Sequence, residues 1–275
     1  MELSEDIASG GVMEERTVNM GKFDHQVVVI TGAGQGAGER LALRFYEAGA
    51  SVCLLDLNSG NLAAIEAGLQ PDPSRFAIYT VDVSDSLQVT SVIREIGKRF
   101  GRIDILINNA GVLHKGMIED STDEHMKLMV DVNLMGPMYC TRACVPYMKG
   151  QGGNIVNVSS VLANFPNTGS GAYGAAKAGV MVLTKVWAAE LAPYGIRVNC
   201  YAPGVLDTPM AEDVIKNRAE SKLCQIPLRR FGKTDDAYDL VSFFCSAEAG
   251  YITGQTIGLD GGMWATQTPT AAWKL

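Results

Sequence analysis

A tyrosine and a lysine lie four residues apart in a stretch of small residues, S-G-A-Y-G-A-A-K-A at 170–178. Ala is the best helix former, and side chains at i and i+4 share one face of a helix. Tyr173 and Lys177 are therefore predicted to project side by side from the start of a helix. Because a nearby ammonium favours the phenolate and lowers the pKa of the phenol, such a pair is suited to moving a proton.

One lysine does not complete this chemistry by itself. A free tyrosine has a pKa of about 10, so proton transfer near pH 7 requires a shift of roughly three units. In isolation, the pattern more often marks a surface tyrosine and a solvated lysine. The rest of the chain must therefore supply the context in which the pair could act.

A glycine-rich turn follows the first predicted strand, Q-V-V-V-I-T at 26–31. Gly32, Gly36 and Gly38 have the spacing G-x-x-x-G-x-G and lead directly into a helical pattern. Glycine lets the backbone turn tightly and approach a pyrophosphate, and a helix N-terminus directs N–H groups and a positive dipole end at phosphates. This strand, turn and helix predict a dinucleotide-binding site.

Asp56 ends the second predicted strand, 24 positions after Gly32. A carboxylate there can accept hydrogen bonds from the adenosine ribose hydroxyls, and its charge would repel a 2′-phosphate. Gln35 stands in the loop where an Arg or Lys would pair with that phosphate. Both residues predict NAD rather than NADP, and the alternative for Asp56 is an ordinary strand-ending turn residue.

The elements that must position these residues alternate between strand and helix. Further strand patterns are S-V-C-L-L-D, R-F-A-I-Y-T-V-D, I-D-I-L-I-N-N, G-N-I-V-N-V-S-S, I-R-V-N-C-Y and I-T-G-Q-T-I-G-L-D-G-G. Such alternation predicts an α/β fold, a single-domain Rossmann-type doubly wound sheet of about seven parallel strands with helices on both faces. We expect a mobile tail at 1–21, the domain at 22–265 with a substrate lid at about 205–230, and a C-terminal tail at 266–275.

Composition excludes several classes of function. The 275 residues are 47% hydrophobic, and the net charge of −7 argues against binding to nucleic acid or anionic membranes. No apolar stretch is long enough to span a membrane, and the acidic first residues do not resemble a signal peptide. None of the six cysteines forms a C-x-x-C pair, which favours reduced thiols in a cytoplasmic protein. Cys140 and Cys144 share a predicted helix face, but without a nearby His they do not indicate a metal site.

The Tyr-Lys pair belongs to a set of seven short motifs at fixed places in the chain. They are T-G-A-G-Q-G-A-G (31–38), D-V (82–83), N-N-A-G (108–111), V-N-L (132–134), V-S-S (158–160), Y-G-A-A-K (173–177) and P-G-V-L-D-T (203–208). Together they resemble the short-chain dehydrogenase/reductases, and the resemblance covers about residues 22–265.

The resemblance implies four catalytic residues. Tyr173 would be the general acid/base, and Lys177 would bind the nicotinamide ribose and, with the positive charge of the oxidised nicotinamide, lower the pKa of Tyr173. Ser160, thirteen positions before Tyr173, would hydrogen-bond the substrate oxygen, with Ser159 the less favoured choice. Asn133 would hold a helix-bound water in a proton relay.

The resemblance also implies a set of NAD contacts from the ends of several strands. Asp82 would contact the adenine, and residues 108–111 would form one wall of the cofactor pocket. The complete predicted set is Gly32, Gln35, Gly36, Ala37, Asp56, Leu57, Asp82, Val83, Asn109, Ala110, Gly111, Tyr173, Lys177, Pro203, Gly204, Val205, Leu206 and Thr208.

The predicted activity is NAD(H)-dependent interconversion of a secondary alcohol and a ketone. A 3-oxoacyl-carrier-protein reductase is a second possibility, although its acidic partner would favour a basic patch, and Lys216, Arg218, Lys222, Arg229 and Arg230 are mixed with acidic residues. A polyol or sugar dehydrogenase is a third. A non-catalytic NAD-sensing Rossmann protein is a fourth, but it would not need the Tyr-Lys-Ser set.

The substrate itself is not readable from the sequence. Five apolar residues of the loops near the site, Leu113, Val161, Leu162, Phe165 and Met210, suggest a mostly apolar or cyclic molecule, with His114 and Asn164 as polar candidates. The resemblance also implies a homotetramer. Trp273 in the C-terminal tail would either cover a neighbouring subunit's site or be disordered.

Overall fold

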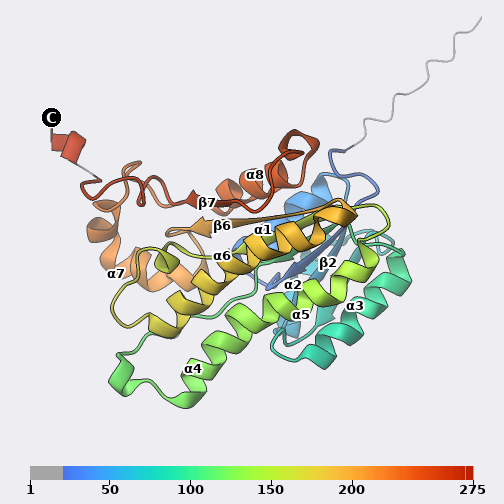
Figure 1. Cartoon of the computed structure of the whole chain (residues 1–275), viewed down its shortest axis with the longest axis horizontal. Helices are drawn as coiled ribbons and strands as arrows, with labels where there is room; N and C mark the ends of the chain where they lie inside the picture. Colours follow the sequence, from blue (N-terminus) through green and yellow to red (C-terminus); the bar gives the residue numbers. More distant parts are fainter. Residues whose placement is uncertain (1–20, 270, 275) are drawn as a thin grey trace, which may run out of the picture.

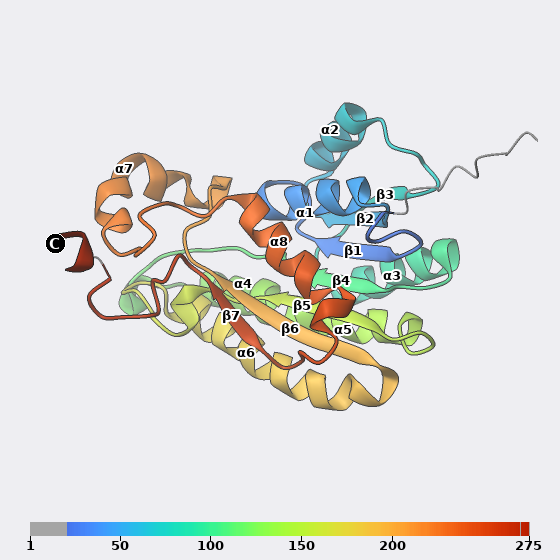
Figure 2. The same ribbon diagram turned by 90° about the horizontal axis from the view of Figure 1, so that it is seen from above.

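The computed structural model describes residues 21–269 and 271–274, so the predicted N-terminal tail, apart from Gly21, lies outside the described residues. A seven-stranded parallel sheet has the order β3-β2-β1-β4-β5-β6-β7, and helices flank it (Figures 1 and 2). The strands are β1 (Val27–Thr31), β2 (Ser51–Asp56), β3 (Phe76–Thr80), β4 (Ile105–Asn108), β5 (Gly153–Val158), β6 (Ile196–Pro203) and β7 (Thr256–Leu259). The helices are α1 (Gly36–Glu47), α2 (Ser59–Leu69), α3 (Ser86–Phe100), α4 (Asp123–Val130), α5 (Gly136–Cys144), α6 (Gly171–Leu191), α7 (Glu212–Leu223) and α8 (Thr234–Phe244). The predicted fold class and all seven predicted strands are confirmed.

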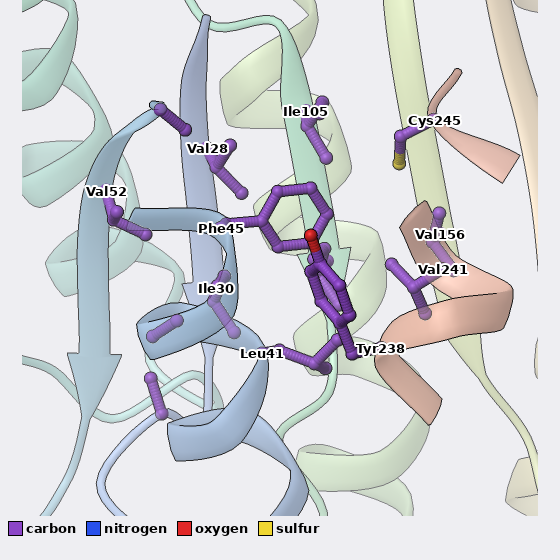
Figure 3. Close-up of a cluster of buried hydrophobic side chains, with 14 of the residues drawn as sticks. Val28, Ile30, Leu41, Phe45, Val52, Ile105, Val156, Tyr238, Val241 and Cys245 are labelled. Atoms are coloured by element: carbon purple, nitrogen blue, oxygen red, sulfur yellow. The ribbon is translucent and has the colours of Figure 1, made fainter. Parts of the chain in front are cut away.

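Strands β1 to β6 each contribute to two hydrophobic cores because their side chains alternate between the faces of the sheet. Val28 and Ile30 pack with residues of α1, α2 and α8 on one face (Figure 3). Val27 and Val29 pack with residues of α3, α5 and α6 on the other. Burial on both faces explains the nearly continuous apolar strands of the sequence, since such strands have no solvent-facing side.

Phe45 of α1 is the centre of an aromatic group in the first core. It is fully buried, and its ring centroid lies 5.4 Å from that of Tyr238 (Figure 3) and 4.7 Å from that of Phe23. We expect Phe45→Leu to lower the free energy of unfolding by roughly 1–2 kcal/mol, because it leaves a small cavity and removes two aromatic contacts. Urea denaturation would measure the loss. Tyr251→Ala, at a fully exposed side chain, is the control, and an equal effect of both substitutions would contradict this account of the core.

The strand order reverses beside β1, and this position determines where a ligand can bind. From β1 the chain moves outward through β2 to β3, then crosses back to place β4 on the other side of β1. In open α/β sheets, the loops at the carboxyl ends of such strands diverge and leave a crevice. The predicted site residues at 32–38, 56–57 and 108–111 follow β1, β2 and β4, so the fold brings them to this crevice.

Candidate active site

The turn after β1 is shaped by two glycines with left-handed backbone conformation. Gly32 and Gly36 have φ values of 62° and 61°, which L-residues with side chains rarely adopt. A Cβ on Gly32 would lie 2.7 Å from the Cα of Ala110, so the turn also requires glycine to pass close to the loop after β4. Among residues 21–269, no side chain caps the N-terminus of α1, whose first residues Gly36 and Ala37 line a large cavity. The N–H groups at the start of α1 are thus available to phosphate oxygens.

Asp56 lies at the carboxyl end of β2 and anchors the glycine turn. Its Oδ2 accepts a hydrogen bond from the N–H of Gly34 at 2.8 Å, and its Oδ1 accepts one from the N–H of Asn58 at 2.9 Å. A Cβ on Gly34 would lie 2.8 Å from the Asp56 carboxyl carbon, so no larger residue fits there without displacement. The carboxylate is part of the cavity wall, with a structural role that the sequence alone did not indicate.

Residues 108–111 bind the loop after β4 to the glycine turn. The Asn109 amide group donates to the carbonyl oxygens of Thr31 and Gly32, both at 3.0 Å. The Thr31 hydroxyl accepts hydrogen bonds from the N–H groups of Asn109 and Ala110, at 3.1 and 3.0 Å. The sequence analysis did not single out Thr31, yet it fixes one edge of the cavity.

Tyr173 and Lys177 lie in the first turns of α6, as the i, i+4 spacing predicts, and both are buried. The Lys177 Nζ donates to the carbonyl oxygen of Val158 at 2.8 Å and lies 5.8 Å from the centroid of the Tyr173 ring. The Ser159 hydroxyl donates to the carbonyl oxygen of Lys177 at 2.8 Å, which ties β5 to α6. Ser159 therefore has a structural partner, whereas Ser160 adjoins Tyr173, which supports the choice of Ser160 over Ser159.

The pKa of Tyr173 differs from the expectation that Lys177 lowers it. In the protein chain alone, burial raises the pKa of Tyr173, and the hydrogen bond with Ser160 opposes this only partly. Burial also lowers the pKa of Lys177 to about 8. The i, i+4 spacing indicates the attraction between the two groups but not the cost of removing both from water, and desolvation has the larger effect on both pKa values.

Asn133 is fully buried behind the cavity wall, in a π-helical turn at Asp131–Met135 that joins α4 to α5. Its Oδ1 accepts from the N–H of Val112 at 3.2 Å, and its Nδ2 donates to the carbonyl oxygens of Val112 and Met129, both at 2.9 Å. A Cβ on Gly111 would lie 2.9 Å from this Oδ1 and 3.4 Å from the Lys177 Nζ. Asn133 therefore holds the loop after β4 next to Lys177, while its predicted water relay remains a prediction.

One cavity of about 820 Å³ joins all of these elements. It is lined by every residue predicted to contact a cofactor, from the glycine turn through Asp82 and Val83 to Pro203 and Thr208, and by Ser160, Tyr173 and Lys177. The structure thus gathers residues from six strand ends, β1 to β6, into a single site.

The other end of the cavity is lined by the expected apolar residues Leu113, Val161, Leu162, Phe165 and Met210. The two polar candidates do not line the cavity. The cavity lining includes Lys115 and Asn167 but neither His114 nor Asn164, and the His114 ring is stacked at 3.6 Å on that of His125. The predicted lid contains α7, from which Val214, Arg218 and Lys222 reach the cavity.

The C-terminal segment departs from the predicted tail. Thr266, Gln267 and Pro269 line the cavity, and the Trp273 indole N–H donates to the carbonyl oxygen of Pro227 at 3.0 Å. Trp273 therefore lies against the lid region of its own chain. The isolated sequence could not show this contact because the partner is a backbone carbonyl.

The described residues show neither a membrane-spanning helix nor a cluster of metal ligands. Within residues 21–269, none of the helices combines the length and apolar character needed to cross a membrane. The same part of the chain contains no group of three or more His, Cys, Asp or Glu side chains arranged to hold a metal ion.

Comparison with known proteins gives the family. A family model described as enoyl-(acyl carrier protein) reductase matches residues 32–264. The 3-oxoacyl-[acyl-carrier-protein] reductase of Thermotoga maritima is 40% identical over 243 residues, 88% of this chain and 99% of the relative. The 2,3-dihydro-2,3-dihydroxybenzoate dehydrogenase of Bacillus subtilis is 34% identical, over 89% of this chain and 98% of the relative.

A solved structure from Brucella melitensis, described as a short-chain dehydrogenase/reductase and glucose/ribitol dehydrogenase, has a TM-score of 0.84 at 31% identity. The match covers 88% of this chain and 98% of that structure. The fold, the Tyr-Lys-Ser site and these relatives agree, and the chain belongs to the short-chain dehydrogenase/reductase family of oxidoreductases.

Proposed function

We propose that this chain reduces the 3-oxo group of an acyl thioester to the 3-hydroxy group, with NADH as the hydride donor. The observation that carries the proposal is the placement of Ser160, Tyr173 and Lys177 in the same cavity as the glycine turn. The substrate class follows the printed function of the relatives that are 36–40% identical. The sequence analysis ranked this class second, and the relatives favour it over a general alcohol dehydrogenase.

The cavity fits a nicotinamide dinucleotide. The glycine turn and the uncapped N-terminus of α1 would hold its pyrophosphate, Asp56 its adenosine ribose, and Lys177 its nicotinamide ribose. The loop containing Pro203 and Thr208 would hold the carboxamide. When bound, the cofactor supplies the hydride chemistry.

The protein groups would then act on the carbonyl oxygen of the substrate. The Tyr173 hydroxyl donates its proton to that oxygen as charge develops on it, and the Ser160 hydroxyl donates a hydrogen bond to the same atom. The Lys177 ammonium, held by the Val158 carbonyl oxygen, stabilises negative charge on Tyr173 after the transfer. In alcohol oxidation the same groups would act in reverse.

A second candidate is oxidation of a small cyclic alcohol or a polyol. It is favoured by the dihydroxybenzoate dehydrogenase and the glucose/ribitol dehydrogenase among the similar proteins and by the apolar residues of the cavity. Turnover of 3-oxobutanoyl pantetheine with NADH, compared with oxidation of cyclic diols and ribitol with NAD, would test the choice. Turnover of the diols or ribitol alone would reject the thioester proposal. An NAD sensor without chemistry would bind NADH and turn over neither class.

Cofactor choice is predicted to depend on the charge of Asp56. We expect NADH to be preferred over NADPH by roughly 10²-fold in kcat/KM, and Asp56→Asn to reduce this to below about tenfold. Asn keeps an oxygen that can accept from the Gly34 N–H, so the substitution tests the charge while limiting damage to the turn. Steady-state kinetics with both cofactors would measure the ratio. Equal use of NADH and NADPH by the wild type would contradict the prediction.

The pH dependence of reduction follows from two shifted groups. Because burial raises the pKa of Tyr173 and lowers that of Lys177 to about 8, both groups are protonated below pH 7.5. We expect kcat for reduction to be level between about pH 5.5 and 7.5 and to fall above about pH 8, where Lys177 loses its charge. Oxidation should increase with pH, since it needs the tyrosinate. A decline in reduction centred well below pH 7 would contradict this assignment.

We also propose a cytoplasmic homotetramer. The six cysteines, all within the described range, are unpaired, which supports a reducing compartment. Val182 and Val186 on α6 are 61% and 44% exposed, and β7 is an edge strand, so both elements offer surfaces for subunit contacts. Sedimentation equilibrium of the full chain would give the number of subunits.

A further inference from the structure

The lid helix α7 has two faces of different chemistry. Val214, Arg218 and Lys222 are spaced at i, i+4 and i+8, and all three line the cavity. Lys216 lies outside the cavity lining and pairs with Glu212 one turn away. An apolar and two basic residues of α7 thus lie on the cavity side, and the helix is kinked between them at Arg218, where φ is −137° and ψ is 20°.

A third cation comes from the loop after β4. Lys115 lines the same cavity, and it is close enough to Lys222 and Asp213 to influence their pKa values. Burial, followed by the charges of Arg218 and Lys115, lowers the pKa of Lys222. These three residues, Lys115, Arg218 and Lys222, are called the basic cluster below.

The carboxylates around the basic cluster leave it with excess positive charge. The Arg218 guanidinium pairs with Asp213 at 2.5 Å, and the Lys222 Nζ donates to the neutral Gln225 amide oxygen at 3.0 Å. Within residues 21–269, no carboxylate forms an ion pair with Lys115 or Lys222. Three cations thus face one paired carboxylate, in a protein whose overall charge is −7.

An anion in the cavity would relieve this repulsion. Arg and Lys form charge-assisted hydrogen bonds with phosphate and carboxylate oxygens, and these bonds are stronger in a partly desolvated cavity than in water. The apolar residues Val214 and Met210 lie on the same lid, so a ligand held here would have an anionic group joined to an apolar or neutral portion. Among the described residues that line the cavity, the carboxylates are Asp56 and Asp82, which follow β2 and β3 rather than belonging to the lid.

We propose that the basic cluster is a subsite for an anionic group of the substrate, a phosphate or a carboxylate, carried on the part of the molecule remote from the reacting carbonyl. This inference rests on the proposed function, because it assigns the anion to the molecule that Tyr173 and Ser160 would act on. The phosphate would belong to a phosphopantetheine-type thioester, and the carboxylate to a small keto acid. The lid would then select substrates by charge as well as by shape.

The test compares ligands that differ only in the anionic group. Calorimetry would measure binding of 4′-phosphopantetheine and pantetheine to the full chain with saturating NAD, and kinetics would compare a cyclic keto acid with its methyl ester. The proteins are the wild type, the double variant Arg218→Gln/Lys222→Gln and the control Lys216→Gln, whose side chain pairs away from the cavity. Thermal unfolding would verify that all three proteins are folded.

We expect one anionic ligand to bind roughly tenfold more tightly than its neutral counterpart in the wild type and in Lys216→Gln. The double variant should lose this gain, and added salt should reduce it in the wild type. A gain with phosphate identifies a phosphopantetheine-type substrate, and a gain with carboxylate identifies a keto acid. Absence of both gains in the wild type, or their persistence in the double variant, would overturn the subsite.

Turnover of the neutral thioester 3-oxobutanoyl pantetheine tests the proposed reaction separately from the subsite. If the protein turns over this compound but binds no anionic ligand more tightly than its neutral counterpart, the proposed subsite is rejected and the proposed reaction stands. A phosphate-dependent gain in binding without turnover of any thioester would support the subsite and reject the thioester reduction.

Discussion

Replacing Tyr173 with Phe is expected to lower kcat for carbonyl reduction by about 10³-fold, because the phenol hydroxyl that lies beside Ser160 would no longer donate a proton in the transition state. The ring remains, so burial against the start of α6 is retained and the fold should be stable. NADH should bind with nearly unchanged affinity, since the phenol contributes little to holding the pyrophosphate or the adenosine ribose. Steady-state kinetics and equilibrium titration of NADH would measure the two effects separately.

Tyr201→Phe is the matched control for this substitution. Tyr201 of β6 also lines the cavity, but its buried hydroxyl makes no hydrogen bond within the described residues. Removing that hydroxyl should change kcat less than about threefold, as expected for a group outside the reaction. If Tyr173→Phe retained more than about a tenth of wild-type kcat, the proton donor would have to be another group.

Replacing Lys177 with Met is expected to lower kcat by about 10²-fold and to raise KM for NADH. The ammonium is buried, 5.8 Å from the Tyr173 ring centroid, so its charge acts on the phenol through a medium of low polarity. Met has a similar length without the charge, which separates electrostatics from cavity formation. The effect on KM follows from the proposed contact of Lys177 with the nicotinamide ribose.

Lys185→Met, two turns further along α6 at an exposed position, is the control for lost helix charge. Lys177→Met should lower kcat, whereas the control Lys185→Met should not. Both substitutions remove one positive charge from α6, so any effect of that lost charge on helix stability should have the same sign in both variants. The pH profile gives a second readout, since the fall in reduction above about pH 8 should disappear in Lys177→Met. Unchanged kcat and pH profile in that variant would reject a role for the ammonium.

The fold could be predicted from the sequence because the patterns that specify it lie within short segments of the chain. Apolar β-branched runs such as 26–31 and 153–158 are buried on both faces of the sheet, and the glycines of the turn after β1 adopt conformations that other residues avoid. The i, i+4 spacing of Tyr173 and Lys177 was sufficient to place them on one face of α6.

The residues that form the site could be predicted from the sequence, but the shift in the pKa of Tyr173 could not. All predicted cofactor contacts line one cavity, since most of them follow strands whose ends the parallel topology brings to the same edge, and α6 adds Tyr173 and Lys177. The rise in the pKa of Tyr173, by contrast, depends on how deeply the ring is buried, which the sequence does not specify. The hydrogen bond from the Gly34 N–H to the Asp56 carboxylate is likewise a tertiary contact that the sequence does not specify.

Residues from the lid and the C-terminal segment were the least predictable. The sequence contained a signal for the basic cluster, namely Arg218 and Lys222 at i, i+4, but which face of α7 meets the cavity depends on how the helix docks. The hydrogen bond from Trp273 to the Pro227 carbonyl oxygen had no signal, because any backbone carbonyl could have served.

The most direct test of the account is a single-turnover measurement with 3-oxobutanoyl pantetheine. Excess wild-type protein loaded with NADH would be mixed with this thioester, and the oxidation of NADH would be followed by absorbance beside Tyr173→Phe and Tyr201→Phe. We predict rapid oxidation of one NADH per substrate in the wild type and in Tyr201→Phe, and about 10³-fold slower oxidation in Tyr173→Phe. Equal rates in the wild type and in Tyr173→Phe would contradict the central claim that Tyr173 donates the proton.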